Sequence, residues 1–339
     1  MVHKNSSSFQ TAALTIDIFG IVSNLLLFIF LQFNNVGSRL TNALMKNQFM
    51  FDALASACAA SSLLISEDFE DFTSSYAQIF CHAWVSRAVF WFVVLLSEAN
   101  LMCITVDRMR AVVFPSNYYH RRGAALAQYV LFVLVYAIVI SVPSSFLVQF
   151  TGSQCYHKLE YYAPGSFRHY SLFFSYFWLV FGYLFPGLVM GASLYKLFAT
   201  VKKMWDKKAN MITLTCTHCV THHQETAHIH LRFEKTIATP AVFMCAVFLI
   251  THSYQVIYMI LCAHRVIQFD ALSVERRLGI LLTVVNSSFN PLILVISSPP
   301  FRRSLIQFLR TCKCPKPTSG GSEDQSCNHC LPELPPQSD

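Results

Sequence analysis

Seven separate stretches of the chain are apolar over about the 20 residues that a helix needs to cross a lipid bilayer. They are residues 11–33, 43–65, 82–107, 125–149, 170–198, 237–263 and 278–297. Because lipid offers the backbone no hydrogen-bond partner, each stretch is predicted to be a helix. Of the 339 residues, 54% are hydrophobic and 13% are charged, whereas soluble domains carry about 25% charged residues. The sequence therefore predicts an all-α membrane protein, a seven-transmembrane helix bundle.

The segments at the two ends of the chain differ in composition from this bundle. Residues 1–10 are polar and are predicted to be an extracellular tail, in which Asn5 begins a triplet that fits the N-glycosylation pattern. Residues 11–311 are predicted to form the membrane domain, which ends in a short amphipathic eighth helix. Residues 312–339 are rich in Pro, Ser and Gly and are predicted to be a disordered cytoplasmic tail.

Lysine and arginine predict the orientation of the bundle. Most of the 25 basic residues fall in segments that share one side of the membrane if the amino end is outside, whereas residues 66–80 on the other side carry four acids and no base. The positive-inside rule then places the amino terminus outside and the carboxyl terminus in the cytoplasm. We expect a multi-pass plasma membrane protein whose basic side faces anionic lipids and acidic protein partners. Nucleic acid is not needed to explain this charge.

Particular residues lie in a characteristic order in or near the predicted spans. They are Gly20, Asn24, Asn42, Asp52, Ser97, Asp107, Arg108, Pro115, Tyr118, Pro143, Pro186 and the run NSSFNP at 286–291. In this order the series resembles the rhodopsin-like (class A) G-protein-coupled receptors over roughly residues 15–312, as a divergent member similar to an invertebrate, flatworm-type group. The resemblance implies a receptor, not an enzyme, that converts binding of an extracellular ligand into activation of a heterotrimeric G protein.

A buried charge in lipid is costly and needs a partner, so Asp52 is a functional candidate. The resemblance places Ser97, Asn286 and Asn290 beside it. All four side chains offer oxygen, the ligand that hard cations prefer, so an allosteric sodium ion is the one cofactor expected. The alternative is a dry polar cluster that holds three helices together.

The resemblance also assigns a switch to the cytoplasmic edge. Arg108 is expected to be held by Asp107, with Glu234 as a second acidic partner, and release of Arg108 would open a cleft for the G protein. Asn290 and Pro291 are expected to bend the last span. The alternatives are an arginine that reaches toward the lipid headgroups and a purely structural kink.

Cysteines are expected in two roles, which depend on their side of the membrane. The resemblance pairs Cys81 with Cys155 in a disulfide on the oxidising side. Cys312 and Cys314 lie beside basic residues after the eighth helix and are candidates for palmitoylation. Unmodified thiols in the tail are the alternative.

The ligand pocket is expected between the outer halves of the third, fifth, sixth and seventh spans. Its candidate residues are Arg87, Phe90, Trp91, His252, Tyr254 and Arg277. Phe90 stands where amine receptors of this family carry an acid, so a biogenic amine is disfavoured. A neuropeptide-like ligand is predicted, because the acidic run 67–71 would attract a basic peptide. The alternative is that these are ordinary solvated charges.

The sequence also allows other classes of function. A transporter or channel with seven helices is the main alternative, although no paired broken helices suggest inverted repeats. A membrane-embedded hydrolase would need metal ligands at one depth, and no HExxH motif or nucleophile elbow occurs. The run CTHCVTHHQETAHIH at 216–230 holds enough Cys and His for zinc but lacks the spacing of a finger, so a variable loop is the alternative.

Overall fold

The computed structural model describes residues 2–35, 38–65, 74–115, 118, 122–151, 154–158, 165–214, 221–271 and 273–311. Side chains are described for these residues except 2–7, 74, 122–124, 165–166, 205, 207–214, 221–238, 300 and 311.

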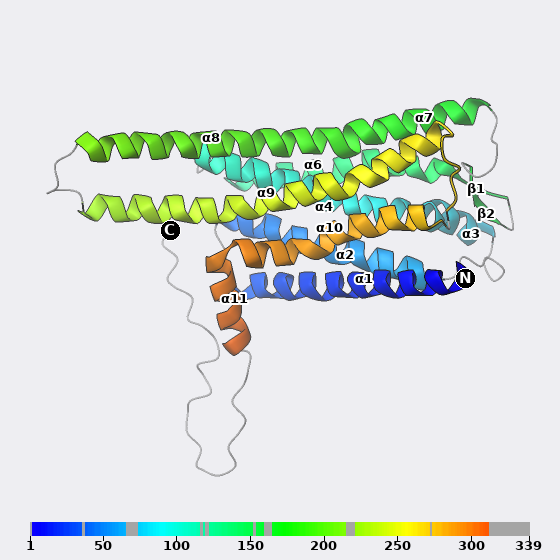
Figure 1. Ribbon diagram of the computed structural model, residues 1–339, viewed down its shortest axis with the longest axis horizontal. Helices are drawn as coiled ribbons and strands as arrows, with labels where there is room; N and C mark the ends of the chain where they lie inside the picture. Colours follow the sequence, from blue (N-terminus) through cyan, green and yellow to red (C-terminus); the bar gives the residue numbers. More distant parts are fainter. Residues whose placement is uncertain are drawn as a thin grey trace, which may run out of the picture.

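Long helices run side by side along one axis and form the bundle (Figure 1). The α-helices are α1 (Val2–Phe33), α2 (Arg39–Leu64), α3 (Ser74–Phe80), α4 (Ala88–Val113), α6 (Arg122–Ser141), α7 (Gly165–Leu179), α8 (Phe185–Leu214), α9 (Thr221–Ala263), α10 (Val274–Ser297) and α11 (Pro299–Thr311). Two π-helical turns, η1 (Cys81–Val85) and η3 (Val180–Leu184), and a 3₁₀ segment, η2 (Val142–Leu147), complete the helical structure of the described residues.

Six helical segments of the described chain are long and apolar enough to cross a membrane. They are Ser8–Phe33, Ala88–Val113, Ala125–Leu147, Phe167–Met204, Thr239–Ala263 and Val274–Ser297. The remaining predicted span lies in α2, which has 26 residues but is less apolar because it buries Asn42, Gln48 and Asp52. These polar groups face the interior of the bundle, so α2 completes the predicted seven-helix arrangement.

Helix α4 lies at the centre of the bundle. In its most apolar segment, 83% is buried. The outer helices bury much less of their apolar surface. On α1, Ile18, Val22, Leu25 and Ile29 are exposed at intervals of three or four residues, which places them on one face. Lipid rather than water is the solvent that this face requires.

Several boundaries differ from the predicted ranges, including the start of α9 at Thr221 and the end of α8 at Leu214. The third span, predicted to end at Asp107, continues as α4 to Val113, so Asp107 and Arg108 lie within a helix rather than at its end. The apolar residues Ala111 and Val112 continue the helical pattern, and Pro115 limits further extension. Helix α1 begins at Val2, so it includes most of the polar segment predicted as a tail.

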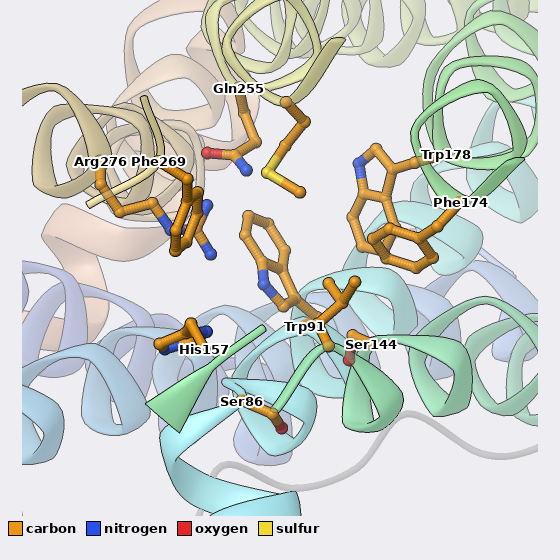
Figure 2. A pocket seen from close by; sticks show the side chains of 11 residues that line it. Ser86, Trp91, Ser144, His157, Phe174, Trp178, Gln255, Phe269 and Arg276 are labelled. Atoms are coloured by element: carbon orange, nitrogen blue, oxygen red, sulfur yellow. The ribbon is translucent and has the colours of Figure 1, made fainter. Parts of the chain in front are cut away.

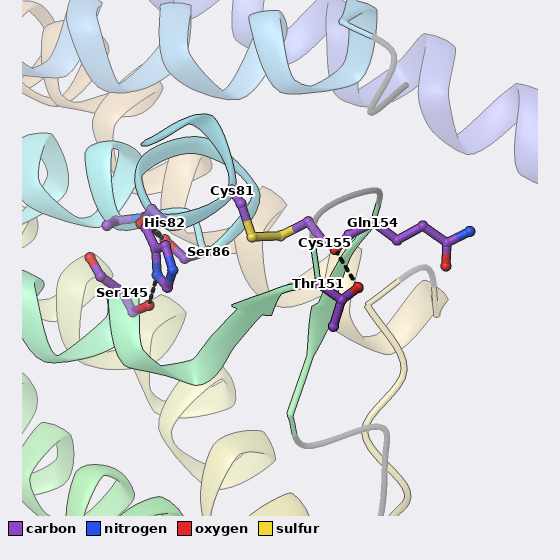
Figure 3. Close-up of a disulfide and its surroundings, with 8 residues drawn as sticks. Cys81, His82, Ser86, Ser145, Thr151, Gln154 and Cys155 are labelled. Atoms are coloured by element: carbon purple, nitrogen blue, oxygen red, sulfur yellow. Dashed lines mark hydrogen bonds between the residues drawn. A yellow bond between two sulfur atoms is a disulfide. The ribbon is translucent and has the colours of Figure 1, made fainter. Parts of the chain in front are cut away.

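A short hairpin closes one end of the bundle, which we call the hairpin end. Strands β1 (Val148–Phe150) and β2 (Cys155–His157) are antiparallel. A disulfide joins Cys155 to Cys81, with Cα atoms 5.6 Å apart (Figure 3). The His82 ring makes a 2.8 Å hydrogen bond through Nδ1 with the carbonyl oxygen of Ser145. The expected disulfide is therefore present and anchors the hairpin to the turn that precedes α4.

The opposite end, which we call the α11 end, carries α11 at a steep angle to the bundle (Figure 1). The aromatic rings of Phe301 and Phe308 pack edge-on against Phe30 of α1, with ring centroids 5.2 and 5.5 Å away. Helices α8 and α9 extend farthest at this end (Figure 1). Helix α9 has 43 residues and contains Pro240.

Candidate functional site

A fully buried carboxylate, Asp52 of α2, lies at the centre of the polar interior. The Ser97 hydroxyl of α4 donates to its Oδ1 at 2.5 Å, and the Asn290 amide of α10 donates to its Oδ2 at 2.8 Å. Three helices thus meet at one carboxylate. Of the four residues predicted for this cluster, Asn286 is buried but makes no hydrogen bond to Asp52.

Gln48 and Asn100 extend this cluster and were missed in the sequence. The Gln48 amide donates to Asp52 Oδ2 at 3.1 Å and to Ser97 Oγ at 2.7 Å. Asn100 in turn donates to Gln48 Oε1 at 2.9 Å. Gln48 lies one helical turn before Asp52, and that spacing was the available signal.

Two amide oxygens of α10 have no hydrogen-bond partner among the described residues. The side-chain oxygens of Asn286 and Asn290 are both buried and unpaired. A buried acceptor without a donor is costly unless water or a cation reaches it. The donor set of carboxylate, hydroxyl and amide oxygens fits a hard cation.

A second buried carboxylate, Asp107, lies toward the α11 end. Its Oδ2 lies 2.6 Å from Nη2 of Arg108, in the one ion pair between described side chains. The Tyr118 hydroxyl donates to Oδ1 at 3.0 Å, and the Thr41 hydroxyl lies 3.4 Å from Oδ2. Asp107 is therefore paired with a cation and two hydroxyls, and it holds Arg108 against α4.

Residues at the start of α2 support this ion pair and were missed in the sequence. Ser38 caps α2, because its hydroxyl accepts from the backbone N–H of Thr41 at 3.2 Å. The same hydroxyl lies 3.3 Å from the Tyr118 hydroxyl. Burial and the Asp107 carboxylate raise the pKa of Tyr118, whereas the Ser38 contact acts in the opposite direction. Tyr118 therefore stays protonated and can donate to Asp107.

Several predicted sites lie outside the described residues. They are the side chains of Asn5 and Glu234, the cysteines Cys312 and Cys314, and the side chains of the Cys/His run at 216–230. Pro291 is buried within α10, which continues through it to Ser297.

A cavity at the hairpin end lies between α4, α7, α9 and α10 (Figure 2). Its lining residues are Ser86, Trp91, Ser144, Leu147, His157, Phe174, Trp178, Gln255, Met259, Phe269 and Arg276. Its volume is only about 20 Å³, because its own side chains nearly fill it. We call it the aromatic cavity, because three of its rings belong to Trp91, Trp178 and Phe269.

The Arg276 guanidinium is the main charge in the aromatic cavity. It is 6% exposed, and its Cζ lies 5.8 Å from the ring centroids of both Trp91 and Phe269. Its Nη1 has no hydrogen-bond partner among the described residues, and neither does Oε1 of Gln255. The cavity lining therefore includes a buried donor and a buried acceptor that lack partners among the described residues.

His157 of β2 lines the same cavity. Burial, followed by the positive charges of Arg276 and Arg87, lowers its pKa from 6.5 to about 3. The imidazole is therefore neutral at physiological pH and adds no charge to the cavity.

A second and wider cavity lies between α1, α2 and α10, with a volume of about 330 Å³. We call it the lateral cavity. Arg87 and Arg277, predicted for a pocket between other helices, line it together with Asp17 of α1. Asp17 was missed in the sequence because a single acid in the first span matches no motif.

The remaining predicted pocket residues lie apart from one another. Phe90 is buried and packs against Trp91, with ring centroids 5.0 Å apart. His252 is buried against Phe248 and lines neither cavity. Tyr254 lies near Gly279 at the contact of α9 with α10. Of the six predicted pocket residues, only Trp91 lines the aromatic cavity.

Comparison with known proteins agrees with this architecture. The profile of the family described as 7 transmembrane receptor (rhodopsin family) matches residues 23–294. No curated protein matches the chain closely enough to report. The matched range includes α2, α4 and most of α10, which contribute the residues around Asp52 and Asp107. The chain therefore belongs to the rhodopsin family of seven-transmembrane receptors, which signal through G proteins from the plasma membrane.

Proposed function

We propose that ligand binding at the hairpin end, which faces outside the cell, activates a heterotrimeric G protein at the α11 end. The observation that carries this proposal is the Arg108–Asp107 ion pair, held at 2.6 Å and surrounded by hydroxyl donors. A restrained arginine toward the end at which α8 and α9 extend farthest is a two-state element that an effector can bias. We infer that G-protein binding requires release of Arg108.

The orientation rests on two observations. The Cys81–Cys155 disulfide lies at the hairpin end, and disulfides persist in oxidising compartments. Bases gather at the other end, including Arg302, Arg303 and Arg310 of α11, as the positive-inside rule requires of a cytoplasmic face. We therefore assign the amino terminus to the outside.

We also propose that a sodium ion binds beside Asp52. The unpaired oxygens of Asn286 and Asn290 would become its ligands together with the Asp52 carboxylate. Such an ion would stabilise the resting arrangement of α2, α4 and α10, since a ligand favours the state that it binds better.

We infer that the ligand is peptide-like and reaches the aromatic cavity. Peptide groups carry both donors and acceptors, which match the unpaired Gln255 oxygen and Arg276 nitrogen. Aromatic rings that line the cavity suit apolar peptide side chains. The acidic run 67–71, outside the described residues, would attract a basic peptide.

The coupling proposal is tested by guanine-nucleotide exchange on purified G proteins added to the receptor in lipid nanodiscs. Asp107→Asn should raise basal exchange about tenfold, because it removes a charged hydrogen bond. Arg108→Ala should abolish exchange while leaving the amount of folded receptor unchanged. Arg110→Ala is the matched control, since Arg110 bonds Tyr129 instead of Asp107. Wild-type exchange in Arg108→Ala would remove the proposal.

The ligand proposal is tested by screening a neuropeptide library for stimulated exchange. Arg276→Gln should then lower the potency of any active peptide about tenfold, because a buried charged hydrogen bond is lost. The exposed Arg168 gives a matched control in Arg168→Gln. Equal potency in both variants would rule out contact with Arg276.

A further inference from the structure

The lateral cavity has the dimensions and chemistry of a binding site. Its volume of about 330 Å³ lies at the lower end of the range of small-molecule pockets. Most of its wall is apolar, from residues such as Ala13, Leu63, Ile280 and Val284. Gln10 and Ser62 add polar groups. The aromatic cavity, by contrast, is nearly filled by its own side chains.

Asp17 is an unusual residue to find on this wall. It is 2% exposed, yet it has no hydrogen-bond or ion-pair partner among the described residues. Burying an unpaired carboxylate is costly, and in membrane helices such groups mark functional sites. Because Asp17 lines the cavity, a cationic ligand group entering there would supply the missing partner.

Arg277 supplies the opposite charge on the same wall. Its side chain is half-buried, and the guanidinium makes no ion pair with any described residue. Asp17 and Arg277 therefore line one cavity without reaching each other. The cavity presents separated charges of opposite sign with apolar surface between them.

The helix geometry gives the scale of this separation. The Ser288 hydroxyl donates to the carbonyl oxygen of Ile16 at 3.3 Å, so the backbone next to Asp17 is level with Ser288. Arg277 precedes Ser288 by 11 residues, or about 16 Å of rise along α10. A ligand that reaches both residues therefore needs a spacer of several bonds between its two charges.

We propose that the lateral cavity binds a small zwitterion, with its ammonium on Asp17, its carboxylate on Arg277 and an apolar spacer against α2 and α10. This goes beyond the proposed function, because the site is separate from the aromatic cavity and its occupancy does not depend on coupling. An amino acid with distant charged groups and a short peptide both have this chemistry. They differ in whether the spacer is methylene or amide.

The test is isothermal titration of full-length receptor in nanodiscs, without G protein, so that a failure of coupling cannot affect the result. The probes are 4-aminobutanoate, 6-aminohexanoate, 8-aminooctanoate and triglycine, with hexylamine and hexanoate as single-charge comparisons. We expect 6- or 8-carbon zwitterions to bind more tightly than 4-aminobutanoate or either single-charge probe. Triglycine binding more tightly than 6-aminohexanoate would assign the site to peptides.

Two variants separate the charges. Asp17→Asn should weaken the best zwitterion and hexylamine at least tenfold while leaving hexanoate unchanged. Arg277→Gln should weaken hexanoate at least tenfold while leaving hexylamine unchanged. The matched controls are Glu275→Gln and Arg168→Gln, which remove the same charges from side chains that are exposed and outside the cavity.

A third variant tests whether binding requires the open volume of the lateral cavity. Ser62→Phe keeps both charges but fills the cavity, and it should abolish binding of every probe. The proposal is overturned if no probe binds at about 10 mM, if Asp17→Asn leaves the affinity for the best zwitterion unchanged, or if Ser62→Phe binds normally. Unfolding curves of each variant confirm that folded protein is being titrated.

Discussion

The two halves of the bundle differ in whether their buried charged groups have partners. Toward the α11 end, Asp107 is paired with Arg108, and Asp52 receives donors from Ser97, Gln48 and Asn290. Toward the hairpin end, the Asp17 carboxyl and the Arg276 and Arg277 guanidiniums make no ion pair within the described structure. The buried carboxylates of one half therefore have partners within the described structure, whereas the charges of the other half are arranged to receive partners from outside.

The two halves should also differ in what holds them together. At the hairpin end, a disulfide closes a loop with a sequence separation of 74. Cys155→Ser should lower the free energy of unfolding by about 4 kcal/mol, because a closed loop of this length restricts the unfolded chain. Thermal unfolding in detergent measures the effect. Cys58→Ser, at a free cysteine, is the control, and equal losses in both variants would contradict the assignment.

The paired and unpaired carboxylates should respond in opposite directions. Asp52→Ala should lower the free energy of unfolding by about 3 kcal/mol, because several buried donors lose their acceptor. Asp17→Ala should leave it equal or higher, since it removes an unpaired buried charge. Melting temperatures of the two variants in one nanodisc preparation provide the comparison. Shifts of the same sign and size would break the contrast between the halves.

Acidification should loosen the hairpin end before the α11 end. The folded pKa of His157 is about 3 and the ordinary value is 6.5. The unfolded state therefore binds more protons in this window, so stability falls as the pH drops below 6.5. At pH 5 the loss is about 2 kcal/mol.

Hydrogen exchange of β1 and β2 at pH 7 and pH 5 measures this loss. His157→Gln should remove the pH dependence, whereas His169→Gln, at an exposed histidine of α7, should retain it. A hairpin that exchanges identically at both pH values in the wild type would count against a buried neutral His157.

The smallest effect is expected where a single hydroxyl supports the ion pair. Tyr118→Phe removes a 3.0 Å hydrogen bond to Asp107 and should cost about 1 kcal/mol. Basal nucleotide exchange should therefore rise about fivefold. Tyr129→Phe is the control, because its hydroxyl accepts from Arg110 instead. Unaltered exchange in Tyr118→Phe would show that the Tyr118 hydroxyl does not support the ion pair that restrains Arg108.

Residues that were predicted from motifs are in contact where they lie at the same depth in the bundle. Asp52, Ser97 and Asn290 lie at matching depths on three helices, and the structure joins them by hydrogen bonds. Cys81 and Cys155 pair because both lie at the same end of the bundle. The resemblance to the receptor family placed the Asp52 partners at these depths, and helix length and polarity alone would not have done so.

Contacts that depend on helix rotation were not predictable. Gln48 and Thr41 are ordinary polar residues until packing turns them toward Asp52 and Asp107. Asp17 becomes a cavity residue only because α2 and α10 pack around α1. Arg87 has a φ of 64° just before α4, a backbone geometry that an arginine rarely adopts. No local pattern in the sequence signals it.

The length of α9 has a mechanical consequence. Pro240 lies 19 residues from the helix start at Thr221, which is about 28 Å of rise. A proline removes a backbone hydrogen bond and is the usual place for a helix to bend. A swing of about 10° at that point carries the tip through about 5 Å at this rise. A slight tilt of the helix in the lipid therefore moves the start of α9 by a distance comparable to the helical pitch.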